Sequence, residues 1–166
     1  GLTDATGLDE AQEKAILAEK VAEYNAALGE RDSFFTVEQL EEAMQKIMDE
    51  YAGGISSYYQ YNEKQLNLAD EKIEQLLKLS DEIGASDMHE LLFAYELKER
   101  LLVCKALIAH LKNRKETRWH SFNENLDHPD TDSRYFKYVN SKLENGTIHI
   151  KFRDIVKEDT YEHKDQ

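Results

Sequence analysis

The chain has 166 residues, enough to bury one core, and its 34 acidic against 21 basic residues give a formal net charge of −13. This balance argues against nucleic acid or an anionic membrane as the partner of the surface as a whole. No apolar run reaches the roughly 18 residues of a membrane span, and the first residues lack the order of a secretion signal. We therefore expect a cytoplasmic protein.

The charge is unevenly distributed along the chain. Residues 1–50 hold 13 acidic and 4 basic residues, net −9, whereas residues 98–118 hold 7 basic and 2 acidic residues, net +5. An anionic ligand or an acidic partner surface should therefore bind at the second region. The single cysteine, Cys104, lies at an apolar point of a helical stretch and is expected to be a packed, structural thiol in a reducing compartment.

Two helices are predicted in the first third of the chain. Residues 9–28 carry apolar side chains at three- and four-residue steps and are followed by Gly29, which favours an amphipathic helix. Its acidic face is expected to be solvated, with a contact to another subunit as the alternative. A second helix should begin after Thr36, whose hydroxyl and the Gln39 side chain form the pattern of a capping box.

Two longer helices follow. One is predicted over about residues 61–83, closed by Gly84, and the other from a cap at Ser86 or Asp87 to about Lys115. Apolar residues of this last helix occupy more than one stripe, so it should be the most buried helix and be contacted on two sides.

The remaining part of the chain changes character. Asn145-Gly146 predicts a two-residue hairpin turn between strands within residues 135–156. We expect a single domain over residues 1–166, mainly α, in which three or four helices pack up and down as in spectrin. An acidic helix (9–28) precedes core helices (36–118), a loop and β-hairpin (119–156) and a frayed end (157–166).

The sequence offers no catalytic, cofactor-binding or metal-binding residues. The six histidines never fall into a spacing that places two metal ligands on one helix face, and no glycine-rich phosphate loop or serine nucleophile elbow is present. No catalytic, cofactor or metal site is therefore predicted in this chain.

The candidate site is the stretch formed by Arg114, Glu116, Thr117, Arg118 and Trp119. Its basic residues could simply complement the negative end of the preceding helix. Alternatively, Arg114, Glu116 and Arg118 form a buried ionic turn that, with Trp119, packs against another domain. A third reading is an anion site over residues 112–118.

Three stretches in this order resemble a known family: QLEEAMQKIMDEYAGGISSYYQYNE (39–63), SDMHELLFAYELKERLLVCKALIAHLKNRKETRW (86–119) and YFKYVNSK (135–142). They are similar to the carboxy-terminal part of the flavoprotein subunit of dissimilatory adenylylsulfate reductase, and more broadly to the helical domain of the fumarate reductase/succinate dehydrogenase flavoproteins. The resemblance covers about residues 34–155. In the broader superfamily the turn reads Arg-x-Glu-Ser-Arg-Gly, which corresponds here to Arg114, Glu116, Thr117 and Arg118.

The resemblance implies a larger parent oxidoreductase. Its FAD would be bound by an N-terminal domain of the same chain, and an iron–sulfur subunit would be a partner. The helical domain would pack against the flavin domain and have no activity alone. Because His120 and Ser121 replace the Pro-Gly of the reductase pattern, a parent of the fumarate reductase/succinate dehydrogenase type stays open. So does a free-standing acidic helical module that binds a protein.

Overall fold

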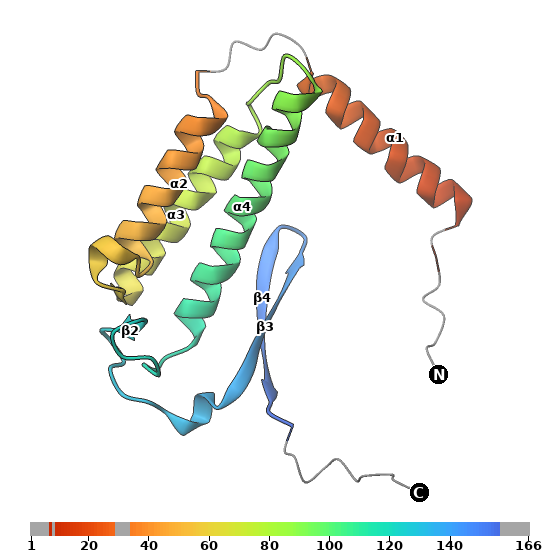
Figure 1. The fold of residues 1–166 in the computed structure, drawn as a ribbon. Coiled ribbons are helices and arrows are strands. Elements are labelled where there is room, and N and C mark those ends of the chain that lie inside the picture. The colour runs from red at the N-terminus through yellow and green to blue at the C-terminus, as the bar shows by residue number, and fades with distance from the viewer. Residues whose placement is uncertain (1–6, 8, 29–33, 157–166) are drawn as a thin grey trace, which may run out of the picture.

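The structure is a computed structural model that describes residues 7, 9–28 and 34–156. Four α-helices lie in these ranges: α1 (Glu10–Ala27), α2 (Val37–Tyr51), α3 (Glu63–Ser80) and α4 (Met88–Asn113). Two 3-10 turns are η1 (Ile55–Ser57) and η2 (Ser133–Tyr135), and the strands are β1 (Gln60–Tyr61), β2 (Glu124–Asn125), β3 (Lys137–Glu144) and β4 (Thr147–Asp154). The mainly helical fold with a β-hairpin is as predicted (Figure 1).

The helices begin where local hydrogen-bonding residues satisfy their first amides. The predicted capping box of α2 is confirmed, because Thr36 Oγ1 accepts from the Gln39 amide at 3.2 Å and the Gln39 side chain accepts from the Thr36 amide at 3.0 Å. Asn62 and Gln65 repeat this arrangement at α3. Of the two caps considered for α4, Asp87 is the one used.

Helices α2, α3 and α4 run up and down and form a three-helix bundle (Figure 1). Their facing stripes meet in one hydrophobic core, in which Ala69, Ile73, Leu101 and Ile108 have no exposed surface. The parallel pair β1–β2 closes the lower end of the bundle: the Glu124 amide donates to Tyr59 O at 3.0 Å and the Leu126 amide to Tyr61 O at 2.8 Å.

Helix α4 is contacted on two sides, by α2 and α3 and by the hairpin, as expected. It is not, however, the most buried helix. The shorter α3 buries Leu66, Ala69, Ile73, Leu76 and Ser80, whereas the 26 residues of α4 bury Leu91, Leu97, Leu101 and Ile108. The second apolar stripe of α4 stays open, since Leu92, Val103 and Leu107 are 54%, 67% and 48% exposed. The apolar residues of α4 span enough of its circumference to be packed on two sides. Among the described residues, α2 and α3 cover one side, and the hairpin covers only part of the other.

Helix α1 forms as predicted but projects from the upper end of the bundle (Figure 1). None of its residues is buried. Only its last turns contact the bundle: the Tyr24 ring meets the Tyr95 ring edge-on at 4.9 Å between centroids, and the Ala85 amide donates to Ala27 O at 3.0 Å. The predicted stop at Gly29 and the predicted frayed end over 157–166 lie outside the described residues.

The predicted hairpin is confirmed. Asn145 and Gly146 both adopt left-handed conformations, with φ of 49° and 76°, between β3 and β4. The side chains of Ile148, Ile150 and Phe152 alternate with more exposed neighbours and form the inner face, which lies toward α4. Because an isolated hairpin is marginal in water, this packing is what holds it in place.

Candidate interdomain site

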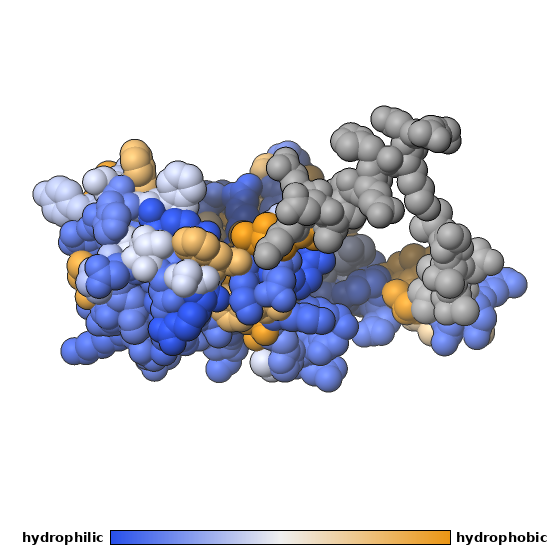
Figure 2. Space-filling view, turned by 90° about the horizontal axis from the view of Figure 1, so that it is seen from below, coloured by the Kyte–Doolittle hydropathy of each residue, from blue (hydrophilic) through white to orange (hydrophobic). Residues whose placement is uncertain are grey.

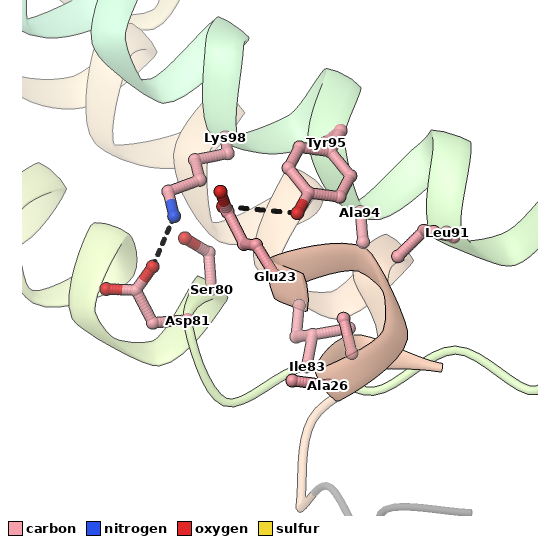
Figure 3. Close-up of a pocket in the computed structure, with 10 residues that line it drawn as sticks. Glu23, Ala26, Ser80, Asp81, Ile83, Leu91, Ala94, Tyr95 and Lys98 are labelled. Carbon is pink, nitrogen blue, oxygen red and sulfur yellow. Dashed lines mark hydrogen bonds and ion pairs between the residues drawn. The ribbon is translucent and has the colours of Figure 1, made fainter. Parts of the chain in front are cut away.

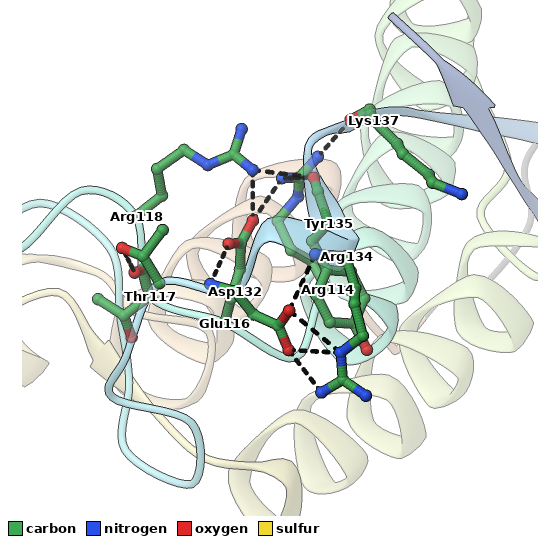
Figure 4. Close-up of polar contacts among 9 residues, drawn as sticks. Arg114, Glu116, Thr117, Arg118, Asp132, Arg134, Tyr135 and Lys137 are labelled. Atoms are coloured by element: carbon green, nitrogen blue, oxygen red, sulfur yellow. Dashed lines mark hydrogen bonds and ion pairs between the residues drawn. The ribbon is translucent and has the colours of Figure 1, made fainter.

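The site is built where α4 ends. Arg114 is its C-cap residue and donates its amide to His110 O at 3.1 Å. Two residues on, the Glu116 carboxylate has no exposed surface and accepts hydrogen bonds from Arg114 Nη1 at 2.8 Å and Arg118 Nη2 at 2.7 Å. Its second oxygen accepts from the Asp132 amide at 3.0 Å (Figure 4). Arg114, Glu116 and Arg118 are named the ionic turn below.

The ionic turn ties the bundle to the start of the hairpin. Arg114 Nη1 and Arg118 Nη2 both donate to Tyr135 O, at 3.0 and 2.8 Å, and Arg114 Nη2 donates to Lys137 O at 3.0 Å. The Arg118 guanidinium also lies 4.7 Å from the centre of the Phe136 ring. A single carboxylate thus fixes two guanidinium groups that in turn hold the backbone entering β3.

Thr117 is a second buried centre of the same turn. Its hydroxyl donates to His128 O at 2.9 Å and accepts from the Asn125 amide at 3.0 Å. Its amide donates to Asp130 O at 3.0 Å, and its carbonyl accepts from Thr131 Oγ1 at 2.8 Å. Thr117 is 1% exposed, so these bonds satisfy groups that water cannot reach. They fold the loop 119–131 back onto the bundle.

Trp119 behaves differently from its four neighbours. Its side chain is 67% exposed, and Phe122 and Leu126 in the same loop are 73% and 50% exposed. Tyr58, in the loop after η1, is 80% exposed, and the neighbouring Tyr59 ring lies 6.4 Å from that of Phe122. These residues, Tyr58, Trp119, Phe122 and Leu126, are named the end patch. Figure 2, which views the molecule from below, shows apolar side chains among hydrophilic ones on this end.

A hollow of about 470 Å³ lies between the ionic turn, α4 and the hairpin, with Trp119, Tyr138 and Ile155 among its walls. Burial raises the pKa of Tyr61, which also lines the hollow, to about 12, while the Arg114 charge opposes this shift and the Glu116 charge adds to it. Burial, followed by the nearby Arg114 charge, lowers the pKa of His110. Both side chains are therefore held in their neutral forms at neutral pH.

The positive stretch 98–118 does not present an open positive surface. Six of its seven basic groups lie beside carboxylates, in the pairs Lys98–Asp81, Arg100–Glu41, Lys105–Glu74, Lys112–Asp70 and the ionic turn. The seventh, Lys115, is exposed and pairs with no carboxylate among the described residues. Most of these carboxylates belong to α2 and α3, which a linear count of charge could not reveal. The expectation that this stretch attracts an anion is accordingly weakened.

Other chemistry is sparse in the described parts of the chain. No three His, Cys, Asp or Glu residues among them are grouped so that they could hold a metal ion. Cys104 is half-buried against the core, and burial raises the pKa of its thiol, which disfavours the reactive thiolate. No helix in the described ranges has the length and apolarity required to span a membrane.

The sequence identified the charged members of the site but not their partners. Arg114, Glu116, Thr117 and Arg118 lie together, and Trp119 faces outward beside them. The hydrogen bonds to the backbone groups of Asp132, Tyr135 and Lys137 were missed. Nearly every residue has a backbone amide and carbonyl, so the residue types do not show which of these groups are used. The contact between Arg118 and the Phe136 ring was also missed, because no sequence spacing indicates that these two residues meet.

Two solved structures of reductases have a similar fold. Adenylylsulfate reductase from Archaeoglobus fulgidus matches 87% of the chain with a TM-score of 0.79 and 29% identity. E. coli quinol fumarate reductase matches 92% with a TM-score of 0.76 and 19% identity, a likeness of fold alone. The bundle and hairpin thus define a helical domain of the kind that such reductases contain.

The family follows from the sequence. The model of the family described as "Fumarate reductase flavoprotein C-term" matches residues 41–166, and the chain belongs to this family. Adenylylsulfate reductase subunit alpha of Megalodesulfovibrio gigas is 33% identical over 100 residues, 60% of this chain. The chain spans 15% of that relative's length and 25% of the Archaeoglobus chain. It is therefore similar to the C-terminal part of a much longer flavoprotein.

Proposed function

We propose that the chain is the C-terminal helical domain of an FAD-dependent oxidoreductase subunit of the adenylylsulfate reductase type, with a structural role and no activity alone. The observation that favours the adenylylsulfate reductase type over the fumarate reductase type is the difference in sequence identity. Identity is 33% and 29% to two adenylylsulfate reductases but 19% to a fumarate reductase of similar fold. A parent of the fumarate reductase/succinate dehydrogenase type, acting on a dicarboxylate, is the alternative.

The structural role has two parts. The buried ionic turn and Thr117 use their charges and hydrogen bonds inside the domain, where they fix the loop and the hairpin. Arg114 makes three hydrogen bonds and Arg118 makes two, all to Glu116 or to backbone carbonyls of this domain, so both side chains are engaged in internal contacts. Arg118 Nε is buried and has no hydrogen-bond partner among the described residues. The exposed end patch, with Trp119, supplies the apolar and aromatic surface that a neighbouring domain would cover.

The proposed parent contains an N-terminal flavin-binding domain and works with an iron–sulfur partner subunit in the cytoplasm. Its FAD would be held by that N-terminal domain. The described residues offer no cradle for a dinucleotide, because the phosphate-binding glycine pattern does not occur in the sequence. The proposed reaction, conversion between adenylylsulfate and sulfite plus AMP, would take place outside this chain.

The test is the reading frame upstream of Gly1 together with the purified protein. We expect an in-frame flavin-binding domain, a yellow full-length protein with FAD near one per chain, and a colourless isolated chain. Stoichiometric FAD on the isolated chain would contradict the proposal. A start codon immediately before Gly1 would favour the free-standing protein-binding module instead. Turnover of fumarate rather than adenylylsulfate would select the alternative substrate.

A further inference from the structure

The outer face of the hairpin carries a row of basic side chains. In β4, His149, Lys151 and Arg153 follow one another at steps of two residues and therefore point to the same side of the sheet. All three are exposed, whereas the apolar residues between them form the inner face that lies toward α4. His149, Lys151 and Arg153 are named the basic row.

The charge of the basic row is not neutralised within the described residues. Three of the five lysines and arginines in residues 132–154 pair with a carboxylate: Arg134 with Asp132, Lys137 with Asp154 and Lys142 with Glu144. Lys151 and Arg153 form no ion pair with a described residue, and their cross-strand neighbours in β3, Asn140 and Tyr138, carry no charge. The row thus keeps two positive charges in a chain whose net charge is −13.

The hollow beside α1 shows the opposite arrangement. There, Tyr95 Oη donates to Glu23 Oε1 at 3.1 Å, and Lys98 pairs with Asp81 (Figure 3). These groups line a hollow of about 200 Å³, and each of them already has a partner inside the domain. The basic row differs because its charged groups are left without one among the described residues.

Arg153 is positioned by an aromatic neighbour. Its guanidinium lies 5.8 Å from the centre of the Tyr138 ring, on the opposite strand of the hairpin. A guanidinium that lies over a ring keeps the N–H donors in its own plane available to a carboxylate. The group that would bind an acidic partner is thus held in place by the hairpin itself.

Protection of the hairpin against unwanted strand pairing does not account for the row. Charged side chains do prevent sheets from pairing edge to edge, but either sign of charge serves that purpose. Side chains two residues apart on one face of a strand lie about 6.7 Å apart, so like charges at this spacing repel. Two unpaired positive charges in an acidic chain therefore indicate that the row meets negative charge outside the described residues.

The spacing of the row indicates the form of its occupant. An extended segment with a carboxylate at every second residue repeats at the same distance of about 6.7 Å, so its carboxylates can meet the row one by one. A nucleic acid strand also carries regular negative charge, but it extends far beyond three side chains and would meet the acidic remainder of the chain. Charge and spacing therefore favour an acidic protein segment.

We propose that the basic row, with Tyr138 beside it, binds an extended acidic segment of another protein, in which Asp or Glu occupies alternate positions. This interaction goes beyond the proposed function, because it needs neither flavin nor substrate and is the same for both types of parent. The segment belongs to a protein outside the parent chain, so the row stays accessible in the full-length, FAD-loaded protein.

Fluorescence anisotropy with the full-length, FAD-loaded protein tests the binding. The probe is a labelled peptide of alternating Glu and Thr, about ten residues long, and a peptide of alternating Gln and Thr is its uncharged counterpart. At about 100 mM salt, where charges beyond about 10 Å are screened, only the acidic peptide should bind. Lys151→Gln combined with Arg153→Gln should weaken that binding by roughly 3- to 30-fold, the effect of two exposed ion pairs.

Lys64→Gln combined with Lys115→Gln is the matched control. Both lysines are exposed, lie outside the hairpin and form no ion pair with a described residue, so the net charge changes by the same amount. The affinity for the acidic peptide should stay within about twofold. Lys151→Glu, which alters a side chain with no ion pair or hydrogen bond among the described residues, repeats the comparison if loss of Arg153 lowers the melting temperature.

Several results would overturn the proposal. Among them are equal affinity of the row variant and the unaltered protein, no binding of the acidic peptide up to about 1 mM, and equal binding of the uncharged peptide. Tighter binding of a uridine oligonucleotide of the same length, lost in the row variant, would assign the row to nucleic acid instead. A dimer seen by light scattering and abolished in the row variant would assign it to a second copy of the chain. The flavin content of the same sample reports on the proposed function separately.

Discussion

Replacing Glu116 with alanine is the most direct test of the ionic turn. The carboxylate accepts from Arg114, Arg118 and the Asp132 amide and has no exposed surface. Its removal leaves two guanidinium groups facing each other across the vacated site. Their own side chains are 28% and 31% exposed, so water can compensate them in part.

The magnitude follows from this partial exposure. Removing one partner of a fully buried ion pair costs about 3–5 kcal/mol, and a buried amide without an acceptor costs about 1–3 kcal/mol. Together these costs come to about 4–8 kcal/mol for groups that water cannot reach. Since both arginines can turn toward solvent, we expect less than this, about 3 kcal/mol. Arg118→Ala should cost less, about 2 kcal/mol, because Arg114 still neutralises Glu116.

Urea unfolding followed by circular dichroism measures the difference, and the melting temperature of the Glu116→Ala variant should fall by about 6–12 °C. The matched control is Glu42→Ala, which removes a glutamate that pairs with Lys46 on the surface, where both side chains are 67% exposed. It should change stability by less than about 0.5 kcal/mol. If Glu116→Ala lost no more than this control, the buried network would not hold the domain together as described.

Three further outcomes are expected. Thr117→Val should destabilise by about 2 kcal/mol, since the Asn125 amide loses its acceptor, whereas Thr117→Ser should retain most of the stability in the same urea titration. Gly146→Ala should cost about 1 kcal/mol, because its φ of 76° disfavours a Cβ even though nothing lies within 4 Å; an unchanged melting temperature would contradict this. The pKa of His110 is lower in the folded protein than in the unfolded chain, whose value is about 6.5. As the pH falls, the unfolded chain binds a proton at His110 before the folded protein does, so the free energy of unfolding should decrease between pH 7.5 and 5.5. His110→Gln should make that decrease smaller, and equal slopes for both proteins in thermal melts would count against the assignment.

Local chemistry explains why much of the fold could be predicted. A capping box needs a hydroxyl and an amide three residues apart, so Thr36 and Gln39 mark the start of α2 without any knowledge of the rest. The turn at Asn145 and Gly146 likewise depends on two residues that tolerate positive φ. In both cases all the interacting groups lie within a few residues of one another, so the sequence alone shows them.

The parts that sequence could not predict depend on contacts between distant segments. An apolar stripe shows that a helix has a face to bury, but not what covers it, which is why the open surfaces of α1 and α4 were not foreseen. The contacts of the ionic turn likewise depend in part on distant segments. Glu116 could be paired with Arg114 and Arg118 from their spacing, whereas their use of Tyr135 O depends on how the loop returns to the bundle.

The end patch and helix α1 lie at opposite ends of the bundle and are held in different ways. The end patch belongs to a loop that Thr117 and the ionic turn fix from within, so its shape is set before any partner binds. Among the described residues, helix α1 contacts the bundle through its last turns, and Leu17 and Val21 are exposed. Loss of Glu116 should therefore disturb the end patch and the hairpin while hydrogen exchange in residues 10–22 of the isolated chain stays the same. The buried charges of this domain therefore fix the shape of the end patch and do not act on helix α1.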